Sequence, residues 1–164
     1  MSGAVLPNGP SRRIAKITLD ESSIGRSGLE IEHERRIAIY DLLEDNTFAL
    51  RDHEGGPYAL HLAIVEKRLV IEINLTDGAR VMAHHLSLTP FRRIVKDYLM
   101  VCDNYYRAIQ TASPSQIEAI DMGRRALHNE GSELLMARLK DKIDMDFDTA
   151  RRLFTLISVL HWKG

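Results

Sequence analysis

Apolar residues recur every three or four positions between Thr89 and Thr111, and this spacing predicts a long amphipathic helix. The apolar stripe of this helix consists of Phe91, Ile94, Val95, Tyr98, Cys102, Tyr105 and Ile109. Thr89 suits a helix cap and Pro90 suits a first helical turn, so the start is well marked. We expect this helix to join two halves of the chain.

The segment before this helix changes to a period of two. Leu69, Ile71, Ile73 and Leu75 alternate with Val70, Glu72 and Asn74, which is typical of a sheet with one face in water. Residues 58–65, 69–75 and 80–88 predict three strands joined by short turns, and therefore an antiparallel meander. Residues 47–50 are a candidate further strand before it, and residues 14–19 a short one.

Helix signals appear on both sides of the meander. Ser27 and Glu30 have the spacing of a capping box and open a helix to about Asp45, with Ile37, Tyr40 and Leu43 expected to face inward. Ser113 and Gln116 repeat the capping pattern and open a helical segment to about Lys142, in which Gly123 and Gly131 leave open whether it is one helix or two. Asp146 is expected to cap a final helix.

This order of elements predicts an α+β fold. We expect an antiparallel meander of about four strands with one N-terminal helix, followed by a C-terminal helical half of three to four helices. Residues 1–11, rich in Pro and Gly, predict a disordered tail, and residues 12–164 a single domain.

Composition excludes several classes of protein. Lys and Arg number 22 against 23 Asp and Glu, a net charge of −1, which disfavours nucleic-acid binding despite several arginine doublets. Cys102 is the only cysteine, so the chain forms no internal disulfide and no thiolate metal cage. The sequence shows no membrane span and no secretory signal, and we expect a cytoplasmic protein without a cofactor.

Two groups of residues are candidates for binding an anion. His84 and His85 lie on a predicted strand, where the side chains of adjacent residues point to opposite faces. The two histidines therefore cannot coordinate one metal ion together. Arg92, Arg93 and Lys96 lie at the start of the long helix, where free N–H groups also attract anions. The alternative, which we favour, is that these basic residues are ordinary solvated side chains.

The last helix offers a candidate interface. Leu156, Val159 and Trp162 widen its apolar arc beyond one stripe, which indicates either a deeply buried helix or a contact with a partner. Tyr106 is a further candidate, since Tyr105 already belongs to the core stripe of the long helix. No catalytic nucleophile motif or phosphate loop is found.

Three stretches are similar to a known family: Ile31–Arg35, Leu127–Gly131 and Asp146–Leu156. The chain resembles, from Arg12 onward, the small alphaproteobacterial proteins numbered 0262 in the series of uncharacterised protein families. The resemblance implies a bacterial cytoplasmic protein and brings no activity or catalytic residue with it. It directs attention to Arg124 and His128, which share a helix face beside Gly131. These residues form either a polar site or, as we favour, a helix-ending signal.

The sequence therefore favours a non-enzymatic interaction or regulatory module, expected to be a homodimer or to bind another protein through its C-terminal helices. The alternative is a protein that binds a small anion or a phosphoester, with enzyme activity left open.

Overall fold

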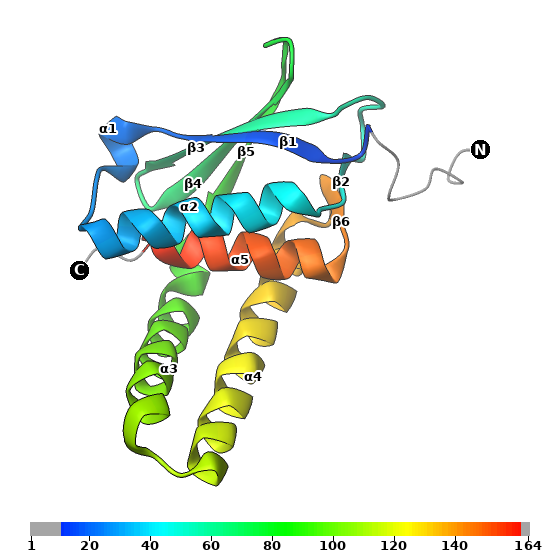
Figure 1. Cartoon of the computed structure of the whole chain (residues 1–164). Helices are drawn as coiled ribbons and strands as arrows, with labels where there is room; N and C mark the ends of the chain where they lie inside the picture. Colours follow the sequence, from blue (N-terminus) through cyan, green and yellow to red (C-terminus); the bar gives the residue numbers. More distant parts are fainter. Residues whose placement is uncertain (1–10, 162–164) are drawn as a thin grey trace.

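The computed structural model describes residues 11–161, and it has the predicted mixture of strands and helices (Figure 1). In chain order the elements are β1 (Ile14–Leu19), α1 (Glu21–Ile24), α2 (Leu29–Glu44), β2 (Phe48–Leu50), β3 (Tyr58–Val65), β4 (Arg68–Leu75), β5 (Arg80–Ser87), a 3₁₀ turn η2 (Thr89–Phe91), α3 (Arg92–Thr111), α4 (Pro114–Leu139), β6 (Ile143–Met145) and α5 (Phe147–His161). The α+β prediction is confirmed. The predicted tail lies outside the described residues except for Ser11, and the single domain stays a prediction.

The main sheet has the strand order β1-β3-β4-β5. Strands β3, β4 and β5 form the predicted antiparallel meander, and β1 adds a fourth strand parallel to β3. The candidate strand at residues 47–50 does form, but β2 pairs with β6 in a separate two-stranded sheet. This strand is therefore not part of the meander, and its partner is the short strand after α4, which the sequence did not indicate.

Helices α2 and α5 lie side by side under one face of the sheet, and α3 and α4 form a hairpin that projects away from this layer (Figure 1). The core between the sheet and the helices is built from alternate strand residues. Those on the inner face include Leu60, Leu62, Leu69, Ile71, Ile73 and Leu86. Alternation of this kind buries one face of each strand, as the pattern predicted.

The inward face of α2 differs from the prediction. Ile37 and Tyr40 are 46% and 63% exposed, while Arg35 and Leu42 are buried. The inward face places Ala38 and Leu42 in the core. The Arg35 guanidinium on the same face donates hydrogen bonds to the carbonyl oxygens of Gly25, at 2.9 Å, and Val159, at 3.3 Å, which a buried arginine requires.

The helix caps agree with the sequence in two of four cases. Ser113 and Gln116 form the predicted capping box, and the Asp146 carboxylate accepts from the Thr149 N–H at 2.9 Å. The Ser27–Glu30 box is wrong, because α2 starts one residue later and Glu32 accepts from the Ser27 N–H instead. Thr89 does not cap the long helix: it begins the η2 turn, whose N-cap is Leu88, and neither η2 nor α3 has a side-chain cap hydrogen bond. Helix α4 is continuous through both glycines.

Candidate functional site

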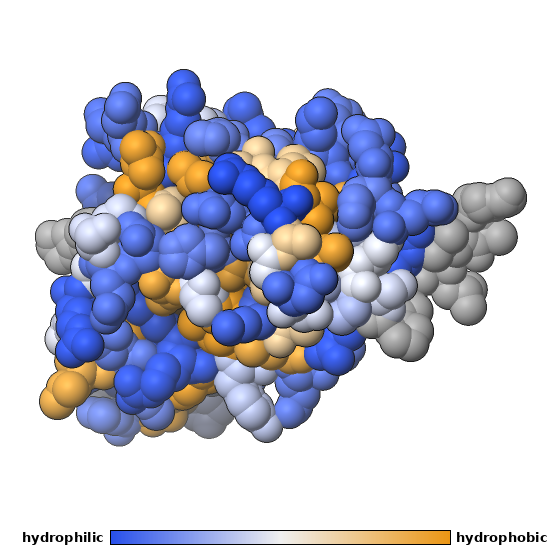
Figure 2. Space-filling view, turned by 90° about the horizontal axis from the view of Figure 1, so that it is seen from above, coloured by the Kyte–Doolittle hydropathy of each residue, from blue (hydrophilic) through white to orange (hydrophobic). Residues whose placement is uncertain are grey.

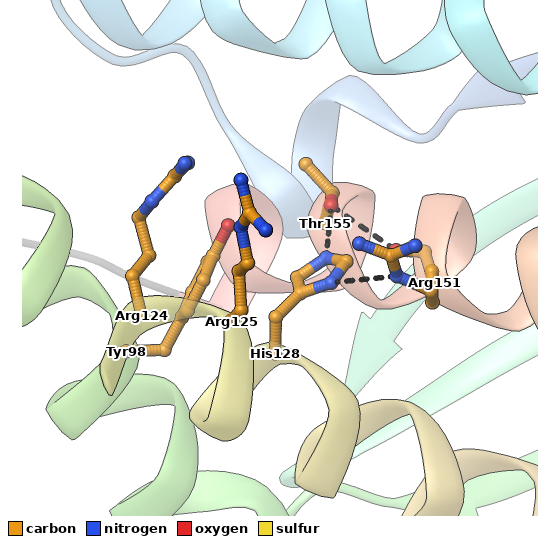
Figure 3. Close-up of a pocket in the computed structure, with 6 residues that line it drawn as sticks. All are labelled: Tyr98, Arg124, Arg125, His128, Arg151 and Thr155. Atoms are coloured by element: carbon orange, nitrogen blue, oxygen red, sulfur yellow. Dashed lines mark hydrogen bonds between the residues drawn. The ribbon is translucent and has the colours of Figure 1, made fainter. Parts of the chain in front are cut away.

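A small cavity opens where α3, α4 and α5 meet (Figure 3). It has a volume of about 250 Å³ and is lined by Tyr98, Arg124, Arg125, His128, Arg151 and Thr155. Tyr98 comes from α3, the next three residues from α4, and the last two from α5. Three of the six lining residues are arginines and none is a carboxylate, so the lining is positively charged.

Helical spacing places these side chains on facing surfaces. Arg124 and His128 are four residues apart on α4, and Arg151 and Thr155 are four residues apart on α5, so each pair shares one face of its helix. A second cavity of about 220 Å³ shares His128, Arg151 and Thr155 and adds Asp148 and Arg152. The two cavities therefore adjoin each other at His128, Arg151 and Thr155.

His128 is held by hydrogen bonds at both ring nitrogens (Figure 3). The Arg151 Nε–H donates to His128 Nδ1 at 3.4 Å, and because arginine has no acceptor, Nδ1 must be the unprotonated nitrogen. His128 Nε2 then donates to the Thr155 hydroxyl at 2.8 Å, and this hydroxyl donates to the Arg151 carbonyl at 3.1 Å. The three residues form one directed chain that fixes the tautomer of His128.

The surroundings keep His128 uncharged. Burial, reinforced by the positive charges of Arg151 and Arg124, lowers the pKa of His128 from 6.5 to about 4. At neutral pH the imidazole is therefore neutral, and the positive charge of the cavity comes from its arginines alone.

One carboxylate orders two of these arginines. Asp121 Oδ1 accepts from Arg124 Nε at 3.0 Å, and Asp121 Oδ2 lies 3.0 Å from Arg125 Nε. The hydrogen bond from Arg124 is the main reason why the pKa of Asp121 lies below its usual value. The Arg124 guanidinium also stacks over the Tyr105 ring, 4.6 Å from its centroid. Arg124 is thus oriented from two sides.

Aromatic rings form the floor of the site. The rings of Tyr98, His128 and Phe154 lie with centroids 5.2 to 5.6 Å apart in tilted and edge-on arrangements. Gly131 makes this possible, since its lack of a side chain lets the Phe154 ring approach α4. The helix-ending signal that we favoured at this point is wrong, because α4 continues through Gly131 to Leu139.

Comparison with known proteins shows the family to which the chain belongs. The model of the uncharacterised protein family UPF0262 matches residues 11–163. The chain belongs to this family. It is 66% identical to a UPF0262 protein of Nitrobacter winogradskyi over 152 residues, covering 93% of this chain and 91% of the relative. It is 62% identical to a UPF0262 protein of Xanthobacter autotrophicus over 156 residues, covering 94% and 95%. No solved structure matches the chain.

Of the predicted anion-binding residues, this UPF0262 protein brings only Arg124 and His128 into the cavity. His84 and His85 lie on β5, where they face opposite sides of the sheet as expected: His84 pairs with the buried Ile71, and His85 with Val70 on the outer face. Burial, together with the charges of His85 and Lys142, lowers the pKa of His84. Neither histidine lines the cavity.

The basic start of α3 is also separate from the cavity. Arg92, Arg93 and Lys96 are exposed, and Arg93 lies near Asp97 in a groove that also holds Glu130. The N–H groups of Phe91 and Arg92 already donate to the carbonyls of Leu88 and Thr89 in the η2 turn. The free N–H groups on which the expectation relied are therefore partly used.

The proposed interface on the last helix is corrected by the structure. Leu156 and Val159 are 0% and 6% exposed, because α5 is the central helix and contacts both α2 and α4. Its wide apolar arc reflects burial within the chain. Trp162 lies outside the described residues. Tyr106, on the projecting hairpin, is 61% exposed and stays available to a partner.

Sequence reasoning missed the α5 side of the cavity and Tyr98. Arg151 and Thr155 carried a usable signal, because polar residues four positions apart share one face of a helix. Tyr98 was assigned to the core stripe, and it is indeed nearly buried, with its pKa raised by burial.

Residues 11–161 contain no candidate metal site and no candidate membrane-spanning helix. No group of three or more His, Cys, Asp and Glu side chains could hold a metal ion in this part of the chain. Burial raises the pKa of the Cys102 thiol. None of the described helices is long and apolar enough to cross a membrane.

Proposed function

We propose that this UPF0262 protein is a non-enzymatic regulatory module that binds a small phosphorylated or carboxylated anion in the cavity between α3, α4 and α5. One observation carries the proposal: Arg124, Arg125 and Arg151 line the same cavity of about 250 Å³ without a carboxylate among the lining residues. Arginine presents a planar set of donors that matches phosphate and carboxylate oxygens.

The arginines keep donors free for a ligand. Each guanidinium has five N–H groups, and Asp121 uses only part of those of Arg124 and Arg125. Arg151 lies 3.9 Å from Asp148, and its side chain is 41% exposed, so this ion pair is weak. Three cations against these two neighbouring carboxylates leave an excess positive charge for an anion.

His128 supports binding rather than turnover. Both of its ring nitrogens are engaged, and its low pKa keeps it neutral, so it offers no free base for catalysis. Its role in this proposal is to hold Arg151 against the cavity. A location in the cytoplasm belongs to the same proposal and fits a chain whose only cysteine, Cys102, is half-buried and forms no disulfide.

The test is calorimetric titration of the protein with inorganic phosphate, pyrophosphate and citrate. Arg125→Gln and Arg151→Gln should each weaken the binding of the best probe by about 10-fold or more, because each removes a charged hydrogen bond. Arg93→Gln is the matched control, since Arg93 is an exposed arginine outside the cavity with its side chain 94% exposed. The absence of binding by all three probes, or equal weakening by Arg93→Gln, would refute the proposal.

A further inference from the structure

Strand β5 forms an open edge of the main sheet. In the order β1-β3-β4-β5 it pairs with β4 on one side, and within residues 11–161 no strand lies on its other side. It is eight residues long, and its register with β4 determines which of its backbone N–H and C=O groups point away from the sheet. An edge of this length is a ready site for pairing with another strand.

The direction of the backbone groups can be derived from one hydrogen bond. The Leu88 N–H donates to the Lys67 carbonyl at 2.9 Å, toward β4. Because N–H and C=O groups alternate in direction along an antiparallel strand, Leu86, His84 and Met82 also point toward β4, opposite Leu69, Ile71 and Ile73. The backbone groups of Ala83, His85 and Ser87 therefore point away from the sheet.

The opposite edge of the sheet is formed by β1, and a side chain binds part of its backbone. On β1 the Asn46 amide accepts from the Ile14 N–H at 2.7 Å and donates to the Ile14 carbonyl at 3.0 Å, so a side chain occupies backbone groups there. The stretch 82–87 of β5 pairs regularly with β4 and contains no proline, lysine or bulge, which are the usual protections of an edge. The register irregularity lies before it, at Ile73/Asn74.

We propose that β5 pairs antiparallel with β5 of a second copy of this chain, about a two-fold axis at His85. In this register His85 lies opposite its own symmetry mate and Ala83 lies opposite the partner's Ser87. All three outward-pointing residues then exchange backbone hydrogen bonds, and the sheet continues from one protomer into the next. This surface is independent of the arginine cavity.

Several observations favour a second copy as the occupant. Residues 81–87 contain no Asp, Glu, Lys or Arg, so symmetric pairing places no formal like charges against each other. The first described strand, β1, forms the opposite edge of the sheet, and in the sequence before it Pro7 and Pro10 lack the N–H that a strand needs. From above, the molecule shows apolar patches separated by hydrophilic side chains (Figure 2). This favours pairing of two copies through the backbone at the sheet edge over packing of two copies through this face.

The first test compares Ala83→Pro with Ala83→Ser by light scattering and analytical ultracentrifugation. Proline removes an N–H that points away from β4, so it spares the intrachain ladder, whereas serine keeps this N–H. We expect a wild-type dimer whose dissociation constant rises by at least about 30-fold in Ala83→Pro, through two symmetric hydrogen bonds, and is unchanged in Ala83→Ser. A monomeric wild type, or a dimer insensitive to Ala83→Pro, would overturn the proposal.

A second test remains informative if Ala83→Pro does not fold. In a Cys102→Ser background, His85→Cys should form an intermolecular disulfide under mild oxidation, because cysteines opposite each other on paired strands are within bonding distance. Ser87→Cys is the control, since it lies four positions from its symmetry mate, roughly 13 Å away. Cross-linking of Ser87→Cys but not His85→Cys would contradict the register, and cross-linking of neither would contradict the interface.

Discussion

Gly131 of α4 lies directly against the ring of Phe154 of α5: a Cβ added at Gly131 would stand 2.3 Å from two ring carbons. This contact lets the two helices that carry the arginine cavity approach each other. Phe154 is fully buried and also packs edge-on against Tyr98 and His128, so it cannot move aside without disturbing the floor of the cavity.

Replacing Gly131 should therefore destabilise the protein although alanine is the better helix former. We expect Gly131→Ala to lower the free energy of unfolding by about 1–3 kcal/mol, since overpacking outweighs helix propensity here. Gly123→Ala is the matched control in the same helix: nothing lies within 4 Å of its added Cβ, and it should stabilise by about 1 kcal/mol. Urea unfolding of the two variants measures both effects, and a stabilised Gly131→Ala would show that the helices separate easily.

His128 should make the stability of the protein depend on pH. Its pKa is about 4 in the folded chain against 6.5 as the ordinary value, so the unfolded chain binds more protons between these two values. The contribution is fully present above pH 6.5 and is lost as the pH falls toward 4. We expect the wild type to lose about 2 kcal/mol more than His128→Gln between pH 7 and pH 4.5.

The measurement is urea unfolding at both pH values for the two proteins. Carboxylates titrate over the same range, but they are common to both proteins, so the difference isolates His128. Identical pH dependence in the wild type and the variant would mean that His128 is accessible to protons in the folded state.

Asp121 competes with any anion for Arg124 and Arg125. Asp121→Asn keeps the shape of the side chain and removes its charge, so it should tighten the binding of pyrophosphate by roughly 3- to 10-fold in calorimetric titration. Asp103→Asn is the control, because Asp103 pairs with Arg107 on the hairpin, away from the residues that line the cavity. Weaker binding by Asp121→Asn would show instead that this carboxylate is needed to orient the two arginines.

Much of the local structure could be predicted because its causes are local. Alternation of Leu69, Ile71 and Ile73 predicted a strand with one buried face, and the spacing of Ser113 and Gln116 predicted the capping box of α4. Such signals depend on neighbours within a few residues, so they survive in the sequence. The same holds for the pairing of Arg124 with His128 on one helix face.

The sequence by itself thus determined the α+β class, the meander and the helical second half, because hydrophobic periodicity directly reflects which face of each element is buried. Only the tertiary structure decided which helix is central. The wide apolar arc of α5, including Leu156 and Val159, is buried within the chain, and periodicity cannot distinguish this from an interface. The spacing of residues within α4 also could not show that Arg151 and Thr155 of α5 complete the cavity. The packing of two helices depends on contacts between residues distant in the sequence, such as Gly131 and Phe154.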